Sequence, residues 1–569
     1  MSFTVHKDVK VAMRDGIELA TDCWVPESVP APTLLVRLPY SKDVPALFAY
    51  GLVPNIFALV EAGYAVVWQD CRGTFRSGGD FTPMLNEPAD GADTIAWLQA
   101  QDWCDGNIGT YGPSYLGFTQ WASLTASDGL KAIAPCVTTT DYYTTPWYSD
   151  GGAASWHTIQ SWGTMMAFAE ALRRKNPQLM MELGGLVADP KPSLAALPSG
   201  HQPVVEKVWP WWSELLSHPS RDQFWQDLSV LDHPERVTIP ALHIGGWFDI
   251  FANNTARTFT ELRARAGTAE AREGQRLIIG PWDHLNSTGV YPDRQFGMMA
   301  DAITQDLTGA HIGFYDRYLR GRDVPATAPV KIFVMGIDQW RDEQAWPLPG
   351  TSYESWYLHG SGQANTAAGD GRLSSQVPAE NATDTYLYDP LRPVPTLGGR
   401  IMLPTQANAA GAVDQRAAEA RDDVLCFSSD VLTEPVEVTG HLSLTLFASS
   451  SATCTDFTGK LVDVFPDGRA IFLTDGILRA RYRNSLAEGE PLTPGETYEL
   501  TLDLSITSNV FLPGHQIRLE VSSSNFPRYD RNTNTGGVIM QDAEPVPAIN
   551  RILHGPDYPS RLTLPIIRR

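Results

Sequence analysis

One serine of this chain, Ser114, lies in a setting that suits covalent chemistry. It belongs to the segment Gly112–Gly117 (G-P-S-Y-L-G), between an apolar run that ends at Tyr111 and a run that favours a helix. A serine at a tight strand-to-helix turn projects its hydroxyl from the sheet, and the first N–H groups of the helix can stabilise a negative charge. The segment departs from the usual G-x-S-x-G pattern, because Leu116 occupies the second glycine position and Gly117 follows it. Taken alone, the motif is equally compatible with an ordinary turn in a glycine-rich chain.

Two later strand ends supply the partners that a serine nucleophile needs. A serine hydroxyl becomes reactive when a base takes its proton, and a carboxylate must hold that base in the right tautomer. Asp249 follows the apolar run 241–245 and His284 follows the run 276–279, so the order is the Ser, Asp, His order of α/β-hydrolases. Asp283 is an alternative orienting acid, although adjacent side chains on an extended backbone usually diverge. A single histidine after a strand is more often a surface residue, but three groups in the expected order favour a catalytic triad.

The tetrahedral intermediate of such a reaction needs hydrogen-bond donors at its oxyanion. The backbone N–H of Tyr115, directly after the serine, is one natural donor. Tyr40 follows the apolar run 32–38 and could offer its phenolic hydroxyl, or could equally be an interior aromatic residue.

The first 140 residues repeat a short apolar run, a loop and a helical segment. The apolar runs lie at residues 32–38, 64–68, 108–111 and 132–134, and the pattern resumes at 240–246 and 276–280. Alternation of this kind predicts a doubly wound, mostly parallel sheet that is covered by helices on both faces.

Between residues 142 and 236 the pattern changes to helical runs such as Met165–Lys175. This stretch is rich in tryptophan: Trp147, Trp156, Trp162, Trp209, Trp211, Trp212 and Trp225. We expect a helical insertion above the carboxyl edge of the sheet, where the ligands of open α/β sheets bind. Alternatively, most of these tryptophans only fill the insertion's own core.

From about residue 351 the hydrophobic period becomes two. The runs 438–447, 497–504 and 515–522 alternate apolar with polar residues, and turn signals separate them. This pattern favours a jelly-roll β-sandwich. The predicted domains are therefore a catalytic domain (1–141 and 237–350), a helical cap (142–236) and a jelly-roll domain (351–569).

Composition excludes several classes of partner. A chain of 569 residues is too long for one hydrophobic core, and 43% hydrophobic with 19% charged residues is typical of a globular protein. The net charge of −22 would repel nucleic-acid phosphates and anionic membranes, so we expect neither as a partner. Six scattered cysteines without a C-x-x-C pair argue against a disulfide framework or a structural zinc site. Because no signal-peptide-like run is present, we expect a cytoplasmic protein.

Further motifs make the chain resemble a known family. They include Cys71–Gly73, the segments Gly245–Asp249 and Gly280–His284, and two long stretches of the C-terminal part, Thr455–Gly468 and Ser522–Asp530. In these motifs the chain is similar to the X-Pro dipeptidyl-peptidase-like acyl hydrolases, in the branch of the bacterial cocaine esterases. The likeness covers essentially the whole chain.

The resemblance implies an α/β-hydrolase domain, an inserted helical domain and a C-terminal jelly roll. It implies that Ser114 is the nucleophile, Asp249 the orienting acid and His284 the base. It places the Tyr40 hydroxyl and the Tyr115 N–H in the oxyanion hole. It implies a serine carboxylesterase that needs no metal or organic cofactor, and it suggests a homodimer.

The resemblance also implies an aromatic acyl pocket that grips a benzoyl group. The counterparts in this chain are Trp147, Trp162, Phe251, Met402 and Leu403, where a phenylalanine is expected at the position of Leu403. Losing that ring should loosen the selectivity for a benzoyl group by about 1 kcal/mol. The expected substrate is thus a small-molecule ester with an aromatic (benzoyl, cocaine-like) or small apolar acyl group.

Three other functions remain open. An α-amino acid ester hydrolase would need carboxylates beside the acyl site to hold a substrate ammonium, and only Asp141, Asp150 and Asp283 are candidates by proximity. An X-Pro dipeptidyl-peptidase must also anchor an amine. A non-catalytic carbohydrate-binding protein should have lost part of the triad or Tyr40, and all four residues are present.

Overall fold

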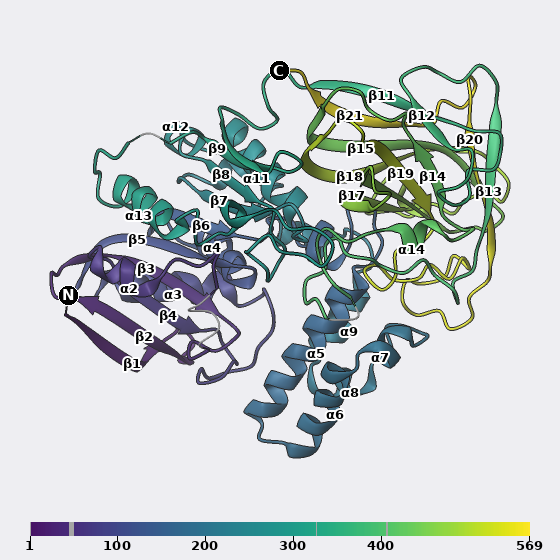
Figure 1. Cartoon of the computed structure of the whole chain (residues 1–569). Coiled ribbons are helices and arrows are strands. Elements are labelled where there is room, and N and C mark those ends of the chain that lie inside the picture. Colours follow the sequence, from purple (N-terminus) through teal and green to yellow (C-terminus); the bar gives the residue numbers. More distant parts are fainter. Residues whose placement is uncertain (1, 45–49, 326, 406–407) are drawn as a thin grey trace.

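The computed structural model describes residues 2–44, 50–325, 327–405 and 408–569. Figure 1 shows a sheet flanked by helices, a group of helices that extends from it, and a separate body of strands at the C-terminal end of the chain. Within the described residues, no helix has the length and apolarity required to span a bilayer.

A sheet of ten strands in the described residues forms the N-terminal half, in the order β1-β2-β4-β3-β5-β6-β7-β8-β9-β10. The pairs β1/β2, β2/β4 and β9/β10 are antiparallel and all others are parallel. The strands are β1 (Phe3–Ala12), β2 (Glu18–Pro26), β3 (Ala31–Leu38), β4 (Ala65–Asp70), β5 (Cys104–Pro113), β6 (Leu130–Cys136), β7 (Leu242–Gly246), β8 (Arg276–Gly280), β9 (Val330–Val334) and β10 (Gln339–Glu343). This arrangement confirms the predicted doubly wound α/β fold.

Helices cover both faces of this sheet, so its central strands are buried along their whole length. Alternate residues of a strand point to opposite faces: Leu34 and Val66 pack with α2 and α13, whereas Leu35 and Val67 pack with α3 and α4. The helices are α2 (Ile56–Glu61), α3 (Glu87–Gln99), α4 (Tyr115–Ala126), α11 (Ala252–Arg265), α12 (Ala269–Glu273) and α13 (Leu307–Tyr318), with a short 3₁₀ turn η3 (Met298–Ala300).

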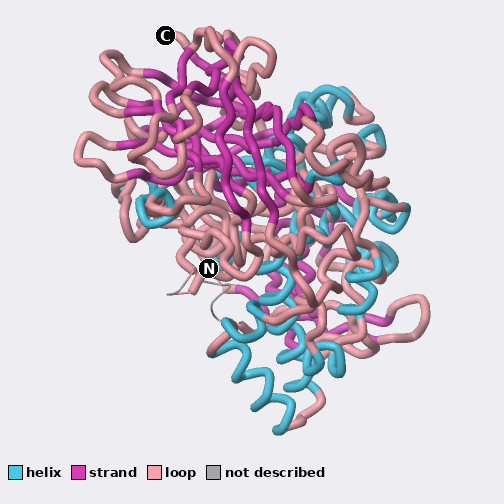
Figure 2. The backbone as a smooth tube through the Cα atoms, turned by 90° about the vertical axis from the view of Figure 1, so that its right-hand side faces the viewer, coloured by secondary structure: helices cyan, strands magenta, loops and turns pink. Residues whose placement is uncertain are grey.

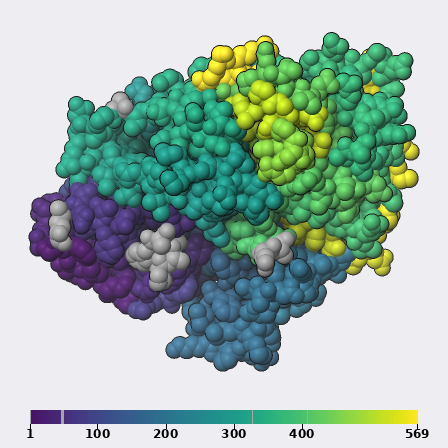
Figure 3. Space-filling view, viewed as in Figure 1, coloured from purple at the N-terminus to yellow at the C-terminus, as the bar shows by residue number. Residues whose placement is uncertain are grey.

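The chain between β6 and β7 forms the group of helices. It contains a π-helical turn η1 (Tyr143–Trp147), helices α5 (Trp156–Arg173), α6 (Pro177–Ala188), α7 (Lys191–Ala195), α8 (Pro203–Val208), α9 (Trp211–Ser217) and α10 (Gln223–Asp227), and a 3₁₀ turn η2 (Pro234–Arg236). Its tryptophans form one buried cluster, which also contains Tyr115 at the start of α4 and Met402 from the C-terminal half. The tryptophans therefore fill the insertion's core and also reach the neighbouring parts of the molecule. Figure 3 shows these helices, in blue, against both other parts.

The C-terminal half consists almost entirely of strands, which Figure 2 shows in magenta. Its eleven-stranded sheet follows the order β13-β20-β15-β21-β11-β12-β14-β19-β16-β17 over the described residues, with β18 paired to β15. The elements are β11 (Ser352–His359), β12 (Arg372–Ser374), β13 (Ala382–Tyr388), α14 (Arg416–Glu419), β14 (Leu425–Ser428), β15 (Val436–Ser450), β16 (Asp456–Val464), β17 (Ala470–Arg479), η4 (Ala480–Tyr482), β18 (Tyr498–Phe511), β19 (Gln516–Ser522), β20 (Ala548–His554) and β21 (Arg561–Ile567). This all-β body is consistent with the predicted sandwich. The boundaries that we predicted for the three domains stay a prediction.

The β body is joined to the catalytic sheet through main-chain and apolar contacts. The N–H of Met335, directly after β9, donates to the carbonyl of Ser508, and the N–H of Val510 donates to the carbonyl of Met335. Phe248 and Phe472 pack at 6.2 Å between ring centroids, so the two halves share one apolar core.

A buried ion pair connects the β body to the insertion. Arg479, at the end of β17, donates to Asp456 at 3.0 and 2.9 Å and to Asp530 at 2.8 Å, and all three side chains are buried. Asp530 also accepts the backbone N–H of Ala154 at 3.0 Å, two residues before α5 begins. This group of contacts fixes where the insertion begins.

We predict that Arg479→Met lowers the free energy of unfolding by about 3–5 kcal/mol, because two carboxylates would stay buried without their cation. Urea denaturation followed by circular dichroism measures the change. The matched control is Arg372→Met, since Arg372 pairs with Asp430 at the surface and should change stability by less than about 1 kcal/mol. Equal effects of the two variants would contradict the prediction.

Candidate active site

Ser114 lies at a sharp corner between β5 and α4. Its backbone has φ 58° and ψ −124°, a conformation that serine rarely adopts. The glycines around it are required by close contacts: a Cβ on Gly112 would lie 2.7 Å from Cβ of Leu116, and a Cβ on Gly117 would lie 2.4 Å from Cγ2 of Thr138. Gly117, the glycine that is one position later than in the usual pattern, therefore allows α4 to pack against the segment after β6. Leu116, which occupies the usual glycine position, is buried in the core of the sheet.

His284 and Asp249 reach Ser114 from the ends of two other parallel strands. Asp249 follows β7 and His284 follows β8, and these strands end at the same edge of the sheet as β5. His284 Nε2 lies 3.1 Å from Ser114 Oγ, and His284 Nδ1 lies 2.8 Å from Asp249 Oδ1. Asp249 is fully buried and also accepts the backbone N–H of Phe251 at 3.2 Å. Serine, imidazole and carboxylate thus form one hydrogen-bonded series.

Asp283 makes different contacts from Asp249. Its carboxylate accepts the backbone N–H groups of Leu285 and Asn286 at 2.8 and 2.7 Å. Burial raises the pKa of Asp283 to about 6. Asp283 therefore closes the turn that carries His284, whereas Asp249 is the carboxylate hydrogen-bonded to the imidazole.

Two groups could donate to an oxyanion near Ser114. The N–H of Tyr115 begins α4, where helical N–H groups have no acceptor within the helix. The hydroxyl of Tyr40, two residues after β3, accepts a hydrogen bond from Trp162 Nε1 at 3.0 Å. Burial raises the pKa of Tyr40 to about 12, against the opposing effect of its hydrogen bonds with Trp162 and Ser114. The phenol therefore keeps its proton at neutral pH and can act as a donor.

The side chain of Tyr115 has a separate structural role. Its hydroxyl donates to Glu87 Oε1 at 3.1 Å and accepts the N–H of Met84 at 2.8 Å. Glu87 in turn pairs with the buried Arg37 at 2.8 Å. These contacts hold the first turn of α4, and with it the backbone N–H of Tyr115.

A cavity of about 30 Å³ opens at Ser114. Its other lining residues are almost all apolar or aromatic: Tyr40, Met84, Tyr115, Thr138, Tyr142, Pro146, Trp147, Trp162, Phe251 and Met402. Four of the five predicted pocket residues line it, namely Trp147, Trp162, Phe251 and Met402. Leu403 instead packs against the apolar cluster around the cavity. The cavity is small and partly open to solvent.

Sequence reasoning missed several residues of the site. Met84, Thr138, Tyr142 and Pro146 line the cavity from connecting segments that carried no motif. Tyr50 was also missed. Its hydroxyl donates to the backbone carbonyl of His284 at 2.6 Å and so stabilises the loop that carries His284.

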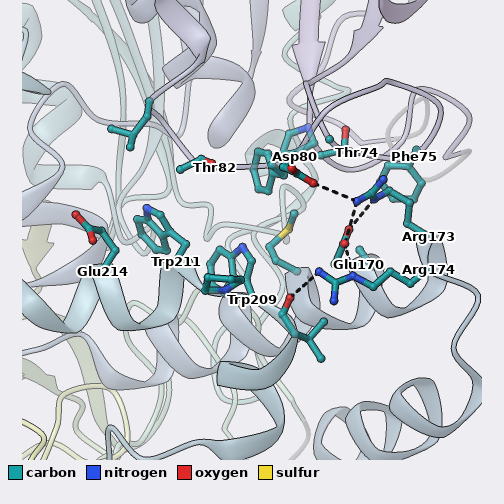
Figure 4. A pocket seen from close by; sticks show the side chains of 18 residues that line it. Thr74, Phe75, Asp80, Thr82, Glu170, Arg173, Arg174, Trp209, Trp211 and Glu214 are labelled. Atoms are coloured by element: carbon teal, nitrogen blue, oxygen red, sulfur yellow. Dashed lines mark hydrogen bonds and ion pairs between the residues drawn. The ribbon is translucent and has the colours of Figure 1, made fainter. Parts of the chain in front are cut away.

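A larger cavity of about 510 Å³ lies beyond the aromatic residues that line the catalytic one. Figure 4 shows Trp209 and Trp211 on one side of it, Thr82 and Asp80 on another, and Glu170 with Arg173 and Arg174 at the far end. The ring of Trp209 lies 5.2 Å from that of Trp162, so the two cavities share an aromatic wall.

Comparisons with known proteins agree with this geometry. Residues 15–286 match the X-Pro dipeptidyl-peptidase (S15 family), and residues 323–563 match the X-Pro dipeptidyl-peptidase C-terminal non-catalytic domain. The chain is 46% identical to the cocaine esterase of Rhodococcus sp. (strain MB1 Bresler), over 100% of this chain and 99% of that protein.

Two solved structures are similar over nearly their full length. One is an aminopeptidase from the marine sediment archaeon Thaumarchaeota archaeon, with a TM-score of 0.82 and 26% identity, over 100% of this chain and 97% of the other. The second is an α-amino acid ester hydrolase, with a TM-score of 0.80 and 25% identity, over 99% of this chain and 97% of the other.

The different contacts of the two aspartates yield a prediction. Asp249→Asn should slow the labelling of Ser114 by a fluorophosphonate about 10³–10⁴-fold, because an amide cannot hold His284 in the tautomer that accepts the serine proton. Asp283→Asn should change the labelling rate little, since an amide oxygen still accepts the N–H groups of the turn. Mass spectrometry of the Ser114 peptide over time measures both rates, and the reverse ranking would assign the orienting role to Asp283.

Proposed function

The chain belongs to the X-Pro dipeptidyl-peptidase (S15) family and is a carboxylic ester hydrolase, and we propose that its substrates are esters with a small apolar or aromatic acyl group. The observation that carries the proposal is the hydrogen-bonded series Ser114–His284–Asp249 at the wall of an aromatic cavity. Such a series activates a serine hydroxyl for acyl transfer, and the cavity offers the acyl group mostly apolar contacts.

The proposed reaction has two steps. Ser114 attacks the ester carbonyl while His284 takes its proton, and Asp249 stabilises the imidazolium. The Tyr40 hydroxyl and the Tyr115 N–H hold the oxyanion. His284 then protonates the leaving alcohol, and water resolves the acyl-enzyme by the reverse sequence. These steps need only the groups of this chain and water.

The charges around the site favour an uncharged acyl group over an α-amino acyl group. A substrate ammonium needs an available carboxylate, and the three candidates have other partners. Asp141 pairs with Arg221 at 3.3 Å, Asp150 pairs with Arg257 at 3.4 Å, and Asp283 accepts two backbone N–H groups. We therefore rank the α-amino acid ester hydrolase and the X-Pro dipeptidyl-peptidase below the carboxylesterase.

The aromatic residues Trp147, Trp162 and Phe251 support a benzoyl-type acyl group, because flat rings pack well against edges and faces of other rings. Met402 is the adaptable member of the lining: its unbranched side chain can move to enlarge the cavity. We propose that small acyl groups enter without this movement and that benzoyl groups require it.

We also propose a cytoplasmic location and a homodimer. All six cysteines lie within the described residues and are buried thiols without a disulfide, which suits a reducing compartment. The dimer rests on the family resemblance alone.

The test of this function is the hydrolysis of 4-nitrophenyl acetate and 4-nitrophenyl benzoate. Both should be cleaved, Ser114→Ala should abolish turnover, and Tyr40→Phe should lower kcat about 10²–10³-fold by removing one oxyanion donor. Absorbance of the released phenol measures the rates, and circular dichroism controls for folding. Turnover that survives in Ser114→Ala would overturn the proposed nucleophile, and cleavage of acetate but not benzoate would restrict the acyl group to small ones.

Acyl selectivity provides a second prediction. Leu403→Phe should raise the ratio of kcat/KM for benzoate over acetate about fivefold, because an added ring contributes about 1 kcal/mol of aromatic packing. Leu387→Phe, at an exposed position of β13, is the matched control and should leave the ratio unchanged. An unchanged ratio in Leu403→Phe would place residue 403 outside the acyl site.

A further inference from the structure

We propose that Trp162 is a positioning residue of the oxyanion hole: its indole N–H holds the Tyr40 hydroxyl so that the phenolic proton points toward the reacting carbonyl. This role is separate from that of an aromatic wall for the acyl group. The inference rests on the proposed function, because it assumes that Tyr40 donates to the oxyanion.

The direction of the Tyr40 hydroxyl follows from the chemistry of its partner. Trp162 Nε1 lies 3.0 Å from the Tyr40 oxygen, and an indole nitrogen donates a hydrogen bond but cannot accept one. The Tyr40 oxygen must therefore accept, and its own proton is directed away from Trp162. Tyr40 and Ser114 line the same small cavity, and the oxyanion would form beside Ser114. Trp162 thus directs the phenolic proton to the place where catalysis needs a donor.

The same contact should strengthen Tyr40 as a donor. A hydroxyl that accepts a hydrogen bond becomes polarised and donates a stronger one, and this effect grows where water is excluded. Part of the surface of Tyr40 is exposed to solvent. Its phenolic hydroxyl is nevertheless surrounded by protein, and this burial raises the pKa of Tyr40 to about 12. As negative charge develops on the substrate oxygen, the Tyr40 oxygen becomes more negative as well, and the Trp162 N–H stabilises that charge through its hydrogen bond.

The indole ring of Trp162 is held from several sides. Its centroid lies 5.2 Å from Trp147, 5.2 Å from Trp209 and 6.2 Å from Trp211, and it stacks on Tyr115 at 6.2 Å. Figure 4 shows Trp209 and Trp211 next to one another, as seen from the larger cavity. Since both come from the insertion, this part of the chain fixes a group that acts on Tyr40 of the catalytic sheet.

The test removes the N–H and keeps an aromatic ring. Trp162→Phe should lower kcat about tenfold for 4-nitrophenyl acetate, the loss of roughly one hydrogen bond, while KM changes little. The factor should be the same for the benzoate ester, because the lost contact is to Tyr40 and not to the acyl group. Trp147→Phe is the comparison for a wall residue, and its effect should differ between the two esters.

A matched control tests whether replacing any buried tryptophan by phenylalanine lowers kcat. Trp121 in α4 is buried, and its N–H has no hydrogen-bond partner among the described residues. Trp121→Phe should therefore retain the kcat of the wild type. If Trp162→Phe folds poorly, Trp162→3-benzothienylalanine keeps the two-ring shape and removes only the N–H.

The double variant separates this inference from the function on which it rests. In the Tyr40→Phe background, Trp162→Phe should cause no further loss of kcat, because its hydroxyl partner is already absent. Three outcomes would overturn the positioning role alone. They are full additivity of the two substitutions, an effect of Trp162→Phe that depends on acyl size, and an unchanged kcat in Trp162→Phe while Tyr40→Phe is impaired. Unimpaired turnover in Tyr40→Phe would overturn the oxyanion role of Tyr40, and this inference with it.

Discussion

The site depends on holding Ser114 in a strained backbone conformation with positive φ at the end of β5. Such a conformation costs about 1–3 kcal/mol, and it persists because the surrounding structure allows no alternative. The corner is packed on both sides: Gly112 allows Leu116 to approach, and Gly117 allows the segment after β6 to pack on α4. The result is a hydroxyl that projects beyond the sheet edge, with the first N–H groups of a helix directly beside it.

The parallel sheet then brings the partners to that hydroxyl. His284 is 170 residues from Ser114 and 35 from Asp249 along the chain, yet all three follow strands that end at one edge. The insertion and the β body contribute the remaining walls, with Trp162 from the first and Met402 from the second. Arg479 and Asp530 tie the β body to the start of the insertion, so the two parts that carry these walls are also joined to each other.

Strand periodicity and chain order carry the part of this structure that is predictable from the sequence. The doubly wound sheet and the all-β C-terminal body were both predictable from the runs of apolar residues, and the order Ser, Asp, His suggested the triad. Position favoured Asp249 over Asp283 as the partner of His284, because adjacent side chains on an extended backbone diverge. The contacts that Asp283 makes instead, with the N–H groups of Leu285 and Asn286, depend on the turn and were not predictable from the sequence. Tyr50 and Met84 were missed because they reach the site from loops, whose course depends on tertiary packing and not on local pattern.

Burial links substrate preference to catalysis at this site. Burial among apolar side chains raises the pKa of the Tyr40 hydroxyl to about 12. The phenol therefore stays protonated, and a preorganised donor in a dry site stabilises an oxyanion more than the same donor in water. A cavity that held carboxylates for a substrate ammonium would bring negative charge close to the forming oxyanion and oppose this stabilisation. In the proposed mechanism, the aromatic lining that suits uncharged acyl groups is thus also the lining under which Tyr40, held by Trp162, is the more effective donor.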